Sequence, residues 1–359
     1  MVKYDAEDLR FAGVVENKVF IGPRNVALHI TNACNLNCVY CCYHSNHNKA
    51  YWPKNKIELS FDRYRAVLDD CRNLKVSNVQ LYGIGEPTMN VYISDMITYA
   101  KKNQFSVRLL TNGVFGEQLL PYVAMADEVC VNMSASNRDL YRLIHSQNAE
   151  DYFRIATDNL SYLCSIKTKK KLRVPFVKVN FVINSLNYKN LLEMFILAKK
   201  LKVDFLNIIV VNTTDFTKFL YPSAKMWKEI DSICLKMLKD RILYSVGNSI
   251  IMNYRRHKKA FSDRKEVNDS KACYLGWYHA YINLQGDVSP CCMINNYAPL
   301  IAGNIYDDKF ADIWRSGVFS RIRARGKDGF FNKRLDACDH CCNSGLNQEP
   351  CDKLRRLDA

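Results

Sequence analysis

Three cysteines lie within eight residues of the chain, Cys34, Cys38 and Cys41, in the spacing C-x3-C-x2-C. They directly follow an apolar segment, 25–31, whose composition is typical of a strand. A short loop after a strand can direct three thiolates toward one side of an iron–sulfur cube. Such clusters are normally held by four cysteines, so a loop with three leaves one iron open to a small molecule. The spacing therefore indicates a reactive cluster rather than one that only transfers electrons.

A zinc site and three unrelated buried thiols are the alternatives for this loop. Zinc favours four ligands, often supplied in paired C-x2-C clips, and the loop has no fourth ligand at a suitable spacing. His44 and His47 follow the loop, but neither repeats a zinc-finger interval. We therefore prefer the cluster interpretation.

The loop, with the aromatic Tyr40 directly before its third cysteine, resembles that of the radical S-adenosylmethionine (SAM) superfamily. The resemblance implies a 4Fe–4S cluster whose open iron binds the amino and carboxylate groups of SAM. It also implies that an electron from the cluster cleaves SAM into methionine and a 5′-deoxyadenosyl radical. That radical abstracts hydrogen from an unactivated C–H bond.

Further SAM contacts follow from the same resemblance. The segment Gly83-Ile84-Gly85-Glu86-Pro87 resembles the superfamily's Gly-Gly-Glu-Pro element, whose backbone and carboxylate receive the SAM amino group. A carboxylate suits an ammonium group, and glycines allow close backbone approach. The other expected contacts are Tyr40 with adenine through its backbone, Ser134 with the carboxylate or ribose, Asn184 with the ribose, and Val210 and Val211 with adenine. For each of them, ordinary strand-end polarity or core packing is the alternative.

Four cysteines nearer the C-terminus form a second pattern. Cys273 and Cys291 fit the spacing C-x12-G-x4-C, and Cys338 and Cys341 follow as a C-x2-C pair. A structural zinc site of four thiolates is one interpretation. The pattern, together with segment 303–317, also resembles the SPASM and twitch extensions of radical SAM enzymes, which carry auxiliary 4Fe–4S clusters.

The second pattern departs from a full SPASM extension in one respect. Cys341 is followed by Cys342 and then Cys351, which does not continue the longer cysteine series. We therefore expect one auxiliary 4Fe–4S cluster. The four cysteines at 273, 291, 338 and 341 would close it, so that it serves as an electron carrier.

Short apolar strands alternate with amphipathic helices between residues 26 and 240. The expected strands cover about 26–31, 78–82, 106–110, 128–133, 174–182 and 205–211, and the expected helices about 61–72, 91–103, 116–124, 137–165, 187–201 and 223–240. Six strand–helix units in a row imply a parallel sheet with right-handed crossovers. We therefore predict an α/β fold, a partial (β/α)6 barrel of the TIM type, with its site at the carboxyl ends of the strands.

The expected domain organisation has four parts. An N-terminal extension, 1–25, precedes the barrel, 26–240, and a basic bridge, 241–272, follows it. A small α+β domain, 273–359, is expected to hold the auxiliary cluster. It should contain a β-hairpin that turns at Gly286 and a helix from about 308 to 325.

Composition favours a globular protein over a membrane protein or a secreted, disulfide-bonded one. With 359 residues, 48% hydrophobic and 24% charged, the chain is typical of a globular protein with a full core. No run of about 18 apolar residues predicts a membrane helix, and the polar N-terminus does not resemble a signal peptide. Fifteen cysteines without an export signal favour cluster ligation in a reducing cytoplasm over disulfides.

The formal charge of +15 favours an acidic partner, although a generally solvated basic surface explains it equally well. The densest basic run, 167–173, lacks the interleaved aromatic residues of RNA-binding segments, so nucleic acid is not expected. No membrane partner is expected. The family resemblance implies an electron donor such as flavodoxin or ferredoxin.

The substrate stays open at this stage. A closed auxiliary cluster can accept one electron from a substrate radical, which with loss of a proton gives a two-electron oxidation, as in the twitch-type aminocyclitol dehydrogenase. We therefore expect oxidation of a small polar molecule: a sugar, an aminocyclitol or a nucleotide-linked sugar. The alternatives are modification of a peptide or protein, by thioether or carbon crosslinking, epimerisation or residue oxidation, and a non-catalytic iron–sulfur electron-transfer protein. No residue pattern identifies a general base.

Overall fold

The computed structural model describes residues 5–51, 53–145, 151–170, 172–239, 272–292, 300–331 and 344–357. Cys338, Cys341 and residues 241–271 of the expected bridge lie outside these ranges. Within them, a nine-stranded sheet has the order β6-β5-β4-β3-β2-β1-β7-β8-β9. The described helices are each too short or too polar to span a membrane.

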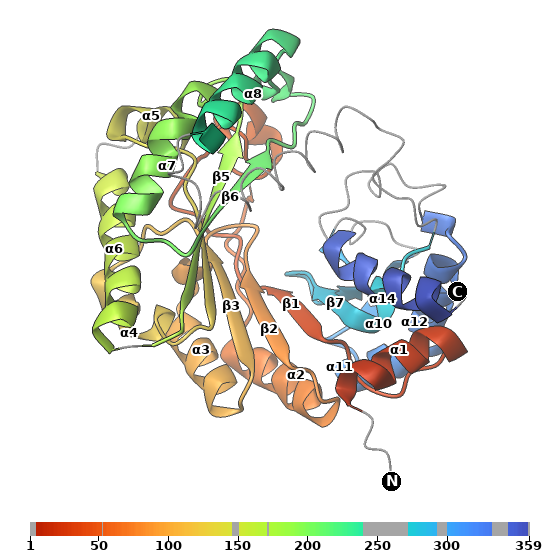
Figure 1. The fold of residues 1–359 in the computed structure, drawn as a ribbon. Coiled ribbons are helices and arrows are strands. Elements are labelled where there is room, and N and C mark those ends of the chain that lie inside the picture. The colour runs from red at the N-terminus through yellow and green to blue at the C-terminus, as the bar shows by residue number, and fades with distance from the viewer. Residues whose placement is uncertain are drawn as a thin grey trace.

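Six consecutive parallel strands form the larger part of the sheet, which confirms the predicted α/β partial barrel (Figure 1). They are β1 (Asn25–His29), β2 (Asn78–Tyr82), β3 (Ser106–Thr111), β4 (Glu128–Asn132), β5 (Phe176–Ile183) and β6 (Phe205–Val210). The helices that follow them are α2 (Phe61–Asn73), α3 (Ile93–Lys102), α4 (Leu120–Val123), α5 (Arg138–Ile144), α6 (Tyr152–Lys170), α7 (Leu191–Lys200) and α8 (Ala224–Lys239). Short 3-10 turns, η1 (Asn46–Tyr51), η2 (Pro87–Met89), η3 (Glu117–Leu119), η4 (Tyr188–Asn190) and η5 (Lys218–Leu220), connect several of them.

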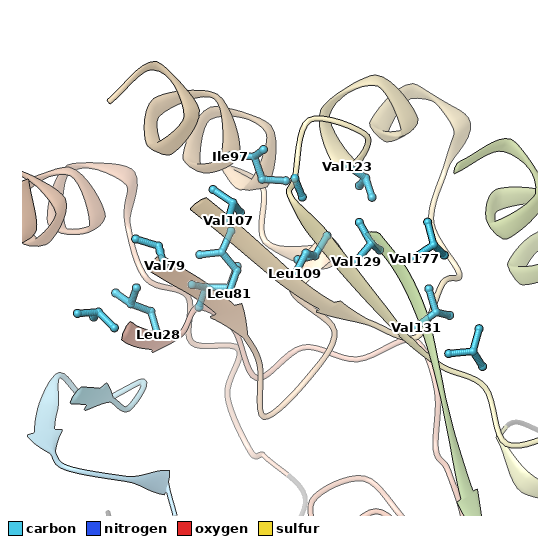
Figure 2. Packing of buried hydrophobic residues seen from close by; sticks show 14 of the residues in the cluster. Leu28, Val79, Leu81, Ile97, Val107, Leu109, Val123, Val129, Val131 and Val177 are labelled. Carbon is cyan, nitrogen blue, oxygen red and sulfur yellow. The ribbon is translucent and has the colours of Figure 1, made fainter. Parts of the chain in front are cut away.

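The two faces of the barrel sheet differ because side chains alternate along a strand. Leu81, Leu109 and Val129 point to the outer face and are fully buried. Figure 2 shows this face packed beneath Ile97 of α3 and Val123 of α4. The apolar outer face attaches the helices. The intervening positions face the barrel interior, where polar residues such as Arg108 and Asn180 stand beside apolar ones such as Leu110 and Val182.

Polar side chains on that interior face are paired across neighbouring strands. The Nε of Arg108 on β3 donates to Glu128 on β4 at 2.7 Å. Further along, Asn180 on β5 donates to Asn132 on β4 at 2.9 Å. These pairs satisfy groups that would otherwise be costly to bury.

The C-terminal part continues the barrel sheet instead of forming a separate layer. Its strands are β7 (His279–Ile282), β8 (Asp287–Ser289) and β9 (Gly303–Asn304), and its helices are α10 (Leu275–Tyr278), α11 (Phe310–Arg315), α12 (Gly317–Lys327) and α14 (Ser344–Leu357). β7 pairs in parallel with β1, and β8 pairs antiparallel with β7. The predicted hairpin is therefore present, with Gly286 at φ 91° in the turn.

Three helical predictions differ from the structure. The N-terminal extension contains an unexpected helix, α1 (Ala6–Glu16), which Asp5 begins with a capping box. The single helix expected over 137–165 consists of α5 and α6. The helix expected over 308–325 is divided at Ser316, whose extended backbone ends α11 and whose hydroxyl caps α12 by accepting from the Phe319 N–H.

Helix α1 lies beside the C-terminal helices (Figure 1). Arg24 joins the two ends of the chain, because it binds Glu7 of α1 and donates to Glu349 of α14 at 2.9 Å. The N-terminal extension thus supports the C-terminal domain rather than the barrel mouth.

Replacing Leu81 by Ala should lower the free energy of unfolding by about 2–5 kcal/mol, because it leaves a cavity between β2 and the helices. Leu192→Ala on α7 is the matched control. That leucine is 44% exposed, and its truncation should change stability by less than about 0.5 kcal/mol. Urea unfolding followed by circular dichroism measures both, and equal losses would contradict the packing described.

Candidate functional site

A cavity of about 520 Å³ lies at the carboxyl ends of the parallel strands. Each barrel strand contributes at least one residue, either from the strand or from its end: His29, Tyr82, Leu110, Asn132, Val182 and Ile209. This is the edge at which parallel barrels carry their sites.

The predicted cluster cysteines Cys34, Cys38 and Cys41 all line this cavity. Their loop is fixed on one side by the end of α5. The backbone N–H of Val39 donates to the Ile144 carbonyl at 2.8 Å, and the N–H of Asn37 donates to the His145 carbonyl at 3.2 Å. Three thiols are therefore held around one space by backbone contacts.

The same loop is fixed on its other side by the segment that follows β2. The N–H of Gly85 donates to the Thr31 carbonyl at 3.1 Å, and the N–H of Glu86 donates to the Ala33 carbonyl at 2.7 Å. A Cβ added at Gly85 would lie 2.0 Å from the Ala33 oxygen. Glycine is thus needed here for the backbone of the loop to approach closely.

Burial controls the ionisation of the three thiols. It raises the pKa of Cys34 to about 12 and raises the pKa of Cys38 and Cys41 above the ordinary thiol value. Backbone N–H groups of Tyr43 and His44 approach the Cys41 sulfur at 3.4 and 3.3 Å. A positively charged iron core would supply the remaining stabilisation that thiolates need in this environment.

The arrangement fits a cluster better than a single ion. Among the described residues, no group of three or more His, Cys, Asp and Glu side chains converges on one metal position. A cube instead takes its thiolates at separate irons, so three spaced sulfurs around one cavity suit it.

Glu86 is 2% exposed, and its carboxylate connects the ends of β2 and β3. Oε1 accepts from Thr88 N–H (3.0 Å), the Thr88 hydroxyl (2.8 Å) and the Thr111 hydroxyl (2.7 Å), and Oε2 accepts from Asn112 N–H at 2.6 Å. Burial raises the pKa of Glu86, whereas these hydrogen bonds lower it. The carboxylate thus holds the cavity wall in place, and its expected contact with the SAM amino group stays a prediction.

The other expected SAM contacts fall into two groups. Tyr40, Gly83, Gly85, Glu86, Val210 and Val211 line the cavity. Ser134 and Asn184 are fully buried and are not among the lining residues. The Ser134 hydroxyl accepts from Val182 N–H at 2.9 Å, and the Asn184 amide oxygen accepts from Leu186 N–H at 2.9 Å, so these two side chains shape the strand ends.

Two histidines of the site were not predicted from the sequence. His29 lines the cavity, and its ring lies 2.8 Å from the hydroxyl of Tyr281 on β7. Burial lowers the pKa of His29 to about 4 and that of His145 to about 3. His29 could have been predicted, because the alternation along β1 places it on the same face as Asn25 and Ala27. The sequence around His145 contains no comparable pattern.

The second set of cysteines is described in part. Cys291 follows β8, and the Cys273 N–H donates to the Gly326 carbonyl at 2.8 Å. Their expected partners Cys338 and Cys341 lie outside the described residues. Cys292 lines the barrel cavity, so the segment that carries Cys291 adjoins the space in which the first three cysteines lie.

Family models match both cysteine regions. Residues 28–162 match the radical SAM superfamily, and residues 273–342 match SPASM, an iron–sulfur cluster-binding domain. The chain belongs to the radical SAM superfamily. Its C-terminal region is a SPASM domain, so both resemblances seen in the sequence are confirmed. The cofactors of this radical SAM protein are SAM, the 4Fe–4S cluster that binds it, and auxiliary iron–sulfur in the SPASM domain.

Three curated relatives resemble this radical SAM protein over most of its length. The tungsten-containing aldehyde ferredoxin oxidoreductase cofactor-modifying protein of Pyrococcus furiosus is 22% identical over 87% of this chain and 88% of the relative. The AdoMet-dependent heme synthase of Methanosarcina barkeri is 25% identical over 84% and 85%. The mycofactocin maturase of Mycolicibacterium smegmatis is 24% identical over 89% and 78%.

Solved structures of the superfamily share the fold. SuiB of Streptococcus suis bound to S-adenosylmethionine superposes with a TM-score of 0.64, at 13% identity, over 93% of this chain and 76% of SuiB. A second structure of SuiB, bound to the precursor peptide SuiA, has a TM-score of 0.63 at 13% identity over 88% of this chain and 70% of SuiB. The structural match therefore includes both the barrel and the C-terminal region.

Gly85→Ala should prevent the cysteine loop from closing on the segment after β2, so that less iron is incorporated during anaerobic reconstitution. Gly317→Ala is the control, because a Cβ there meets only the Arg321 side chain, at 3.6 Å. Iron and sulfide per chain are measured for both variants. If Gly85→Ala has a normal iron content, the close approach of Gly85 to the Ala33 carbonyl is not required for the site.

Proposed function

We propose that this radical SAM protein modifies a peptide or protein substrate. When bound, SAM and the reduced cluster supply hydrogen abstraction from an unactivated C–H bond, with methionine and 5′-deoxyadenosine as the other products. The barrel positions the substrate group beside SAM and excludes water from it.

The proposal assigns the site residues as follows. Cys34, Cys38 and Cys41 hold the SAM-binding cluster. SAM contacts come from Tyr40, Gly83, Gly85, Glu86 and Val211, while Ser134 and Asn184 act by holding the strand ends behind them. One closed auxiliary cluster is held by Cys273, Cys291, Cys338 and Cys341, and flavodoxin or ferredoxin supplies the electron.

The main support for the proposal is the share of this chain that aligns with relatives whose names describe the modification or maturation of another molecule. The cofactor-modifying protein and the mycofactocin maturase match over 87% and 89% of this chain, which includes both cysteine regions. SuiB, which shares the fold, has been solved with a precursor peptide. These likenesses favour the peptide alternative over the sugar oxidation expected first from the sequence.

The composition of the cavity supports the same choice. Leu36, Leu110 and Ile209 supply apolar wall, and among the described lining residues there is no lysine or arginine. A phosphorylated or nucleotide-linked sugar normally needs such cations for recognition, whereas an uncharged amino-acid side chain does not. Oxidation of a small polar molecule stays a prediction that the experiment below tests directly.

His29 at the end of β1 and Tyr281 on β7 are placed to handle a proton. His29 is neutral at pH 7 and lies beside the Tyr281 hydroxyl at the cavity wall. We assign this pair as the acceptor for the proton that leaves the substrate in an oxidative reaction.

The test is substrate-dependent formation of 5′-deoxyadenosine by the anaerobically reconstituted, reduced protein. Peptides are synthesised with the sequences encoded by neighbouring genes. They are compared with sugars, aminocyclitols and nucleotide-linked sugars at equal concentration. A peptide should raise deoxyadenosine above the substrate-free rate and itself change in mass. A sugar that does so, while every peptide leaves the rate unchanged, would overturn the proposal. A variant with Cys34, Cys38 and Cys41 replaced by Ala is the control and should form none.

A further inference from the structure

His145 lies between the cysteine loop and the end of β4. Its side chain is 1% exposed, and both ring nitrogens have a neighbour. Nδ1 lies 3.1 Å from the sulfur of Cys38, and Nε2 lies 2.8 Å from the backbone nitrogen of Ser134. One imidazole thus connects a cluster cysteine to the barrel sheet.

These two contacts determine which nitrogen carries the proton. A backbone N–H can only donate, so Nε2 must accept from Ser134 and must be unprotonated. A neutral imidazole then carries its proton on Nδ1. The N–H of His145 is therefore directed at the Cys38 sulfur as a donor.

The ring is held firmly in this orientation. The Tyr141 ring packs on it with centroids 4.6 Å apart, and Tyr40 contacts it edge-on at 6.0 Å. The carbonyls of Ile144 and His145 accept from the cysteine loop, so donor and acceptor belong to one fixed unit.

We propose that His145 is a positioning residue that donates its Nδ1–H to the thiolate of Cys38 and thereby raises the reduction potential of the SAM-binding cluster. Hydrogen bonds to ligand sulfurs are one of the properties that set the potential of an iron–sulfur cluster. A donor stabilises the reduced cluster more than the oxidised one, because reduction adds negative charge to the sulfurs. Without the donor, the cluster is harder to reduce and SAM cleavage requires a stronger reductant.

The Cys38 contact differs from those of Cys41. The sulfur of Cys41 is approached by backbone N–H groups, which side-chain substitution leaves in place. The donor to Cys38 is a side chain, so mutation can remove it. The inference rests on Cys38 as a cluster ligand and is independent of the substrate proposed above.

Two variants separate the two contacts of the ring. In His145→Asn, the amide nitrogen takes the place of Nδ1 and keeps a donor for Cys38, while the contact with Ser134 is lost. In His145→Gln, the amide lies one bond farther out, where its oxygen can accept from Ser134 but no donor reaches Cys38. Tyr141→Phe is the packing control, because its buried hydroxyl has no hydrogen-bond partner among the described residues.

The readout is a redox titration of the reconstituted full-length protein without substrate, followed by electron paramagnetic resonance. The signal of the loop cluster is identified by its loss when the three loop cysteines are replaced by Ala. His145→Gln should lower the ratio of reduced to oxidised cluster roughly tenfold at a fixed potential, a shift of about 59 mV for one electron. His145→Asn and Tyr141→Phe should stay near the wild-type potential.

An unchanged potential in His145→Gln, or an equal shift in His145→Asn, would overturn the role of the donor. If the wild-type protein binds no cluster at the loop, the assignment of Cys38 as a cluster ligand is wrong. If His145→Gln does not bind the cluster, ¹⁵N chemical shifts of His145 in the oxidised wild-type protein decide the matter. A protonated Nδ1 supports the proposal, and a protonated Nε2 overturns it. None of these results depends on whether the substrate is a peptide.

Discussion

The backbone hydrogen bonds on both sides of the cysteine loop are the interaction on which the rest of the site depends. Gly85 and Glu86 bind one side through the carbonyls of Thr31 and Ala33, and the end of α5 binds the other. These contacts keep three partly buried thiols around one cavity, where none of them is readily ionised without a positive partner. The loop is thus shaped in advance for a cluster, and the strand ends around it form the walls for SAM and substrate.

Support for this loop extends through a second layer of polar residues. Glu86 joins the ends of β2 and β3, and His145 joins the loop to β4 through Ser134. Each of the two side chains binds one backbone N–H, that of Asn112 for Glu86 and that of Ser134 for His145, which ties the strand ends to the site. The C-terminal domain completes the arrangement by adding β7 beside β1, which places Tyr281 against His29 at the cavity.

Much of the fold could be predicted from the sequence because its signals are local. The alternation of strands and helices predicted the parallel sheet, and Gly286 predicted the hairpin turn. The cysteine spacings predicted both iron–sulfur regions that the family models match. Features that depend on distant contacts were missed. The helix α1 is stabilised against the C-terminal helices, and β7 joins the barrel sheet by pairing with a strand more than 250 residues earlier.

The site shows the same division. Cys34, Cys38, Cys41 and Glu86 lie on the cavity wall because they belong to the segments that follow β1 and β2. Ser134 and Asn184 also follow strands, yet their side chains are used within the protein, which strand position alone does not predict. His145 has no sequence signal, because its contact with Cys38 arises from the packing of α5 on a loop 107 residues away.

The central claim is that one chain holds an open cluster on three loop cysteines and a closed cluster on four C-terminal cysteines. Mössbauer spectroscopy of the protein reconstituted with ⁵⁷Fe tests this most directly. The account predicts roughly eight irons per chain, of which a single iron changes its signal when SAM is added. Roughly four irons per chain, or eight with none that responds to SAM, would contradict it.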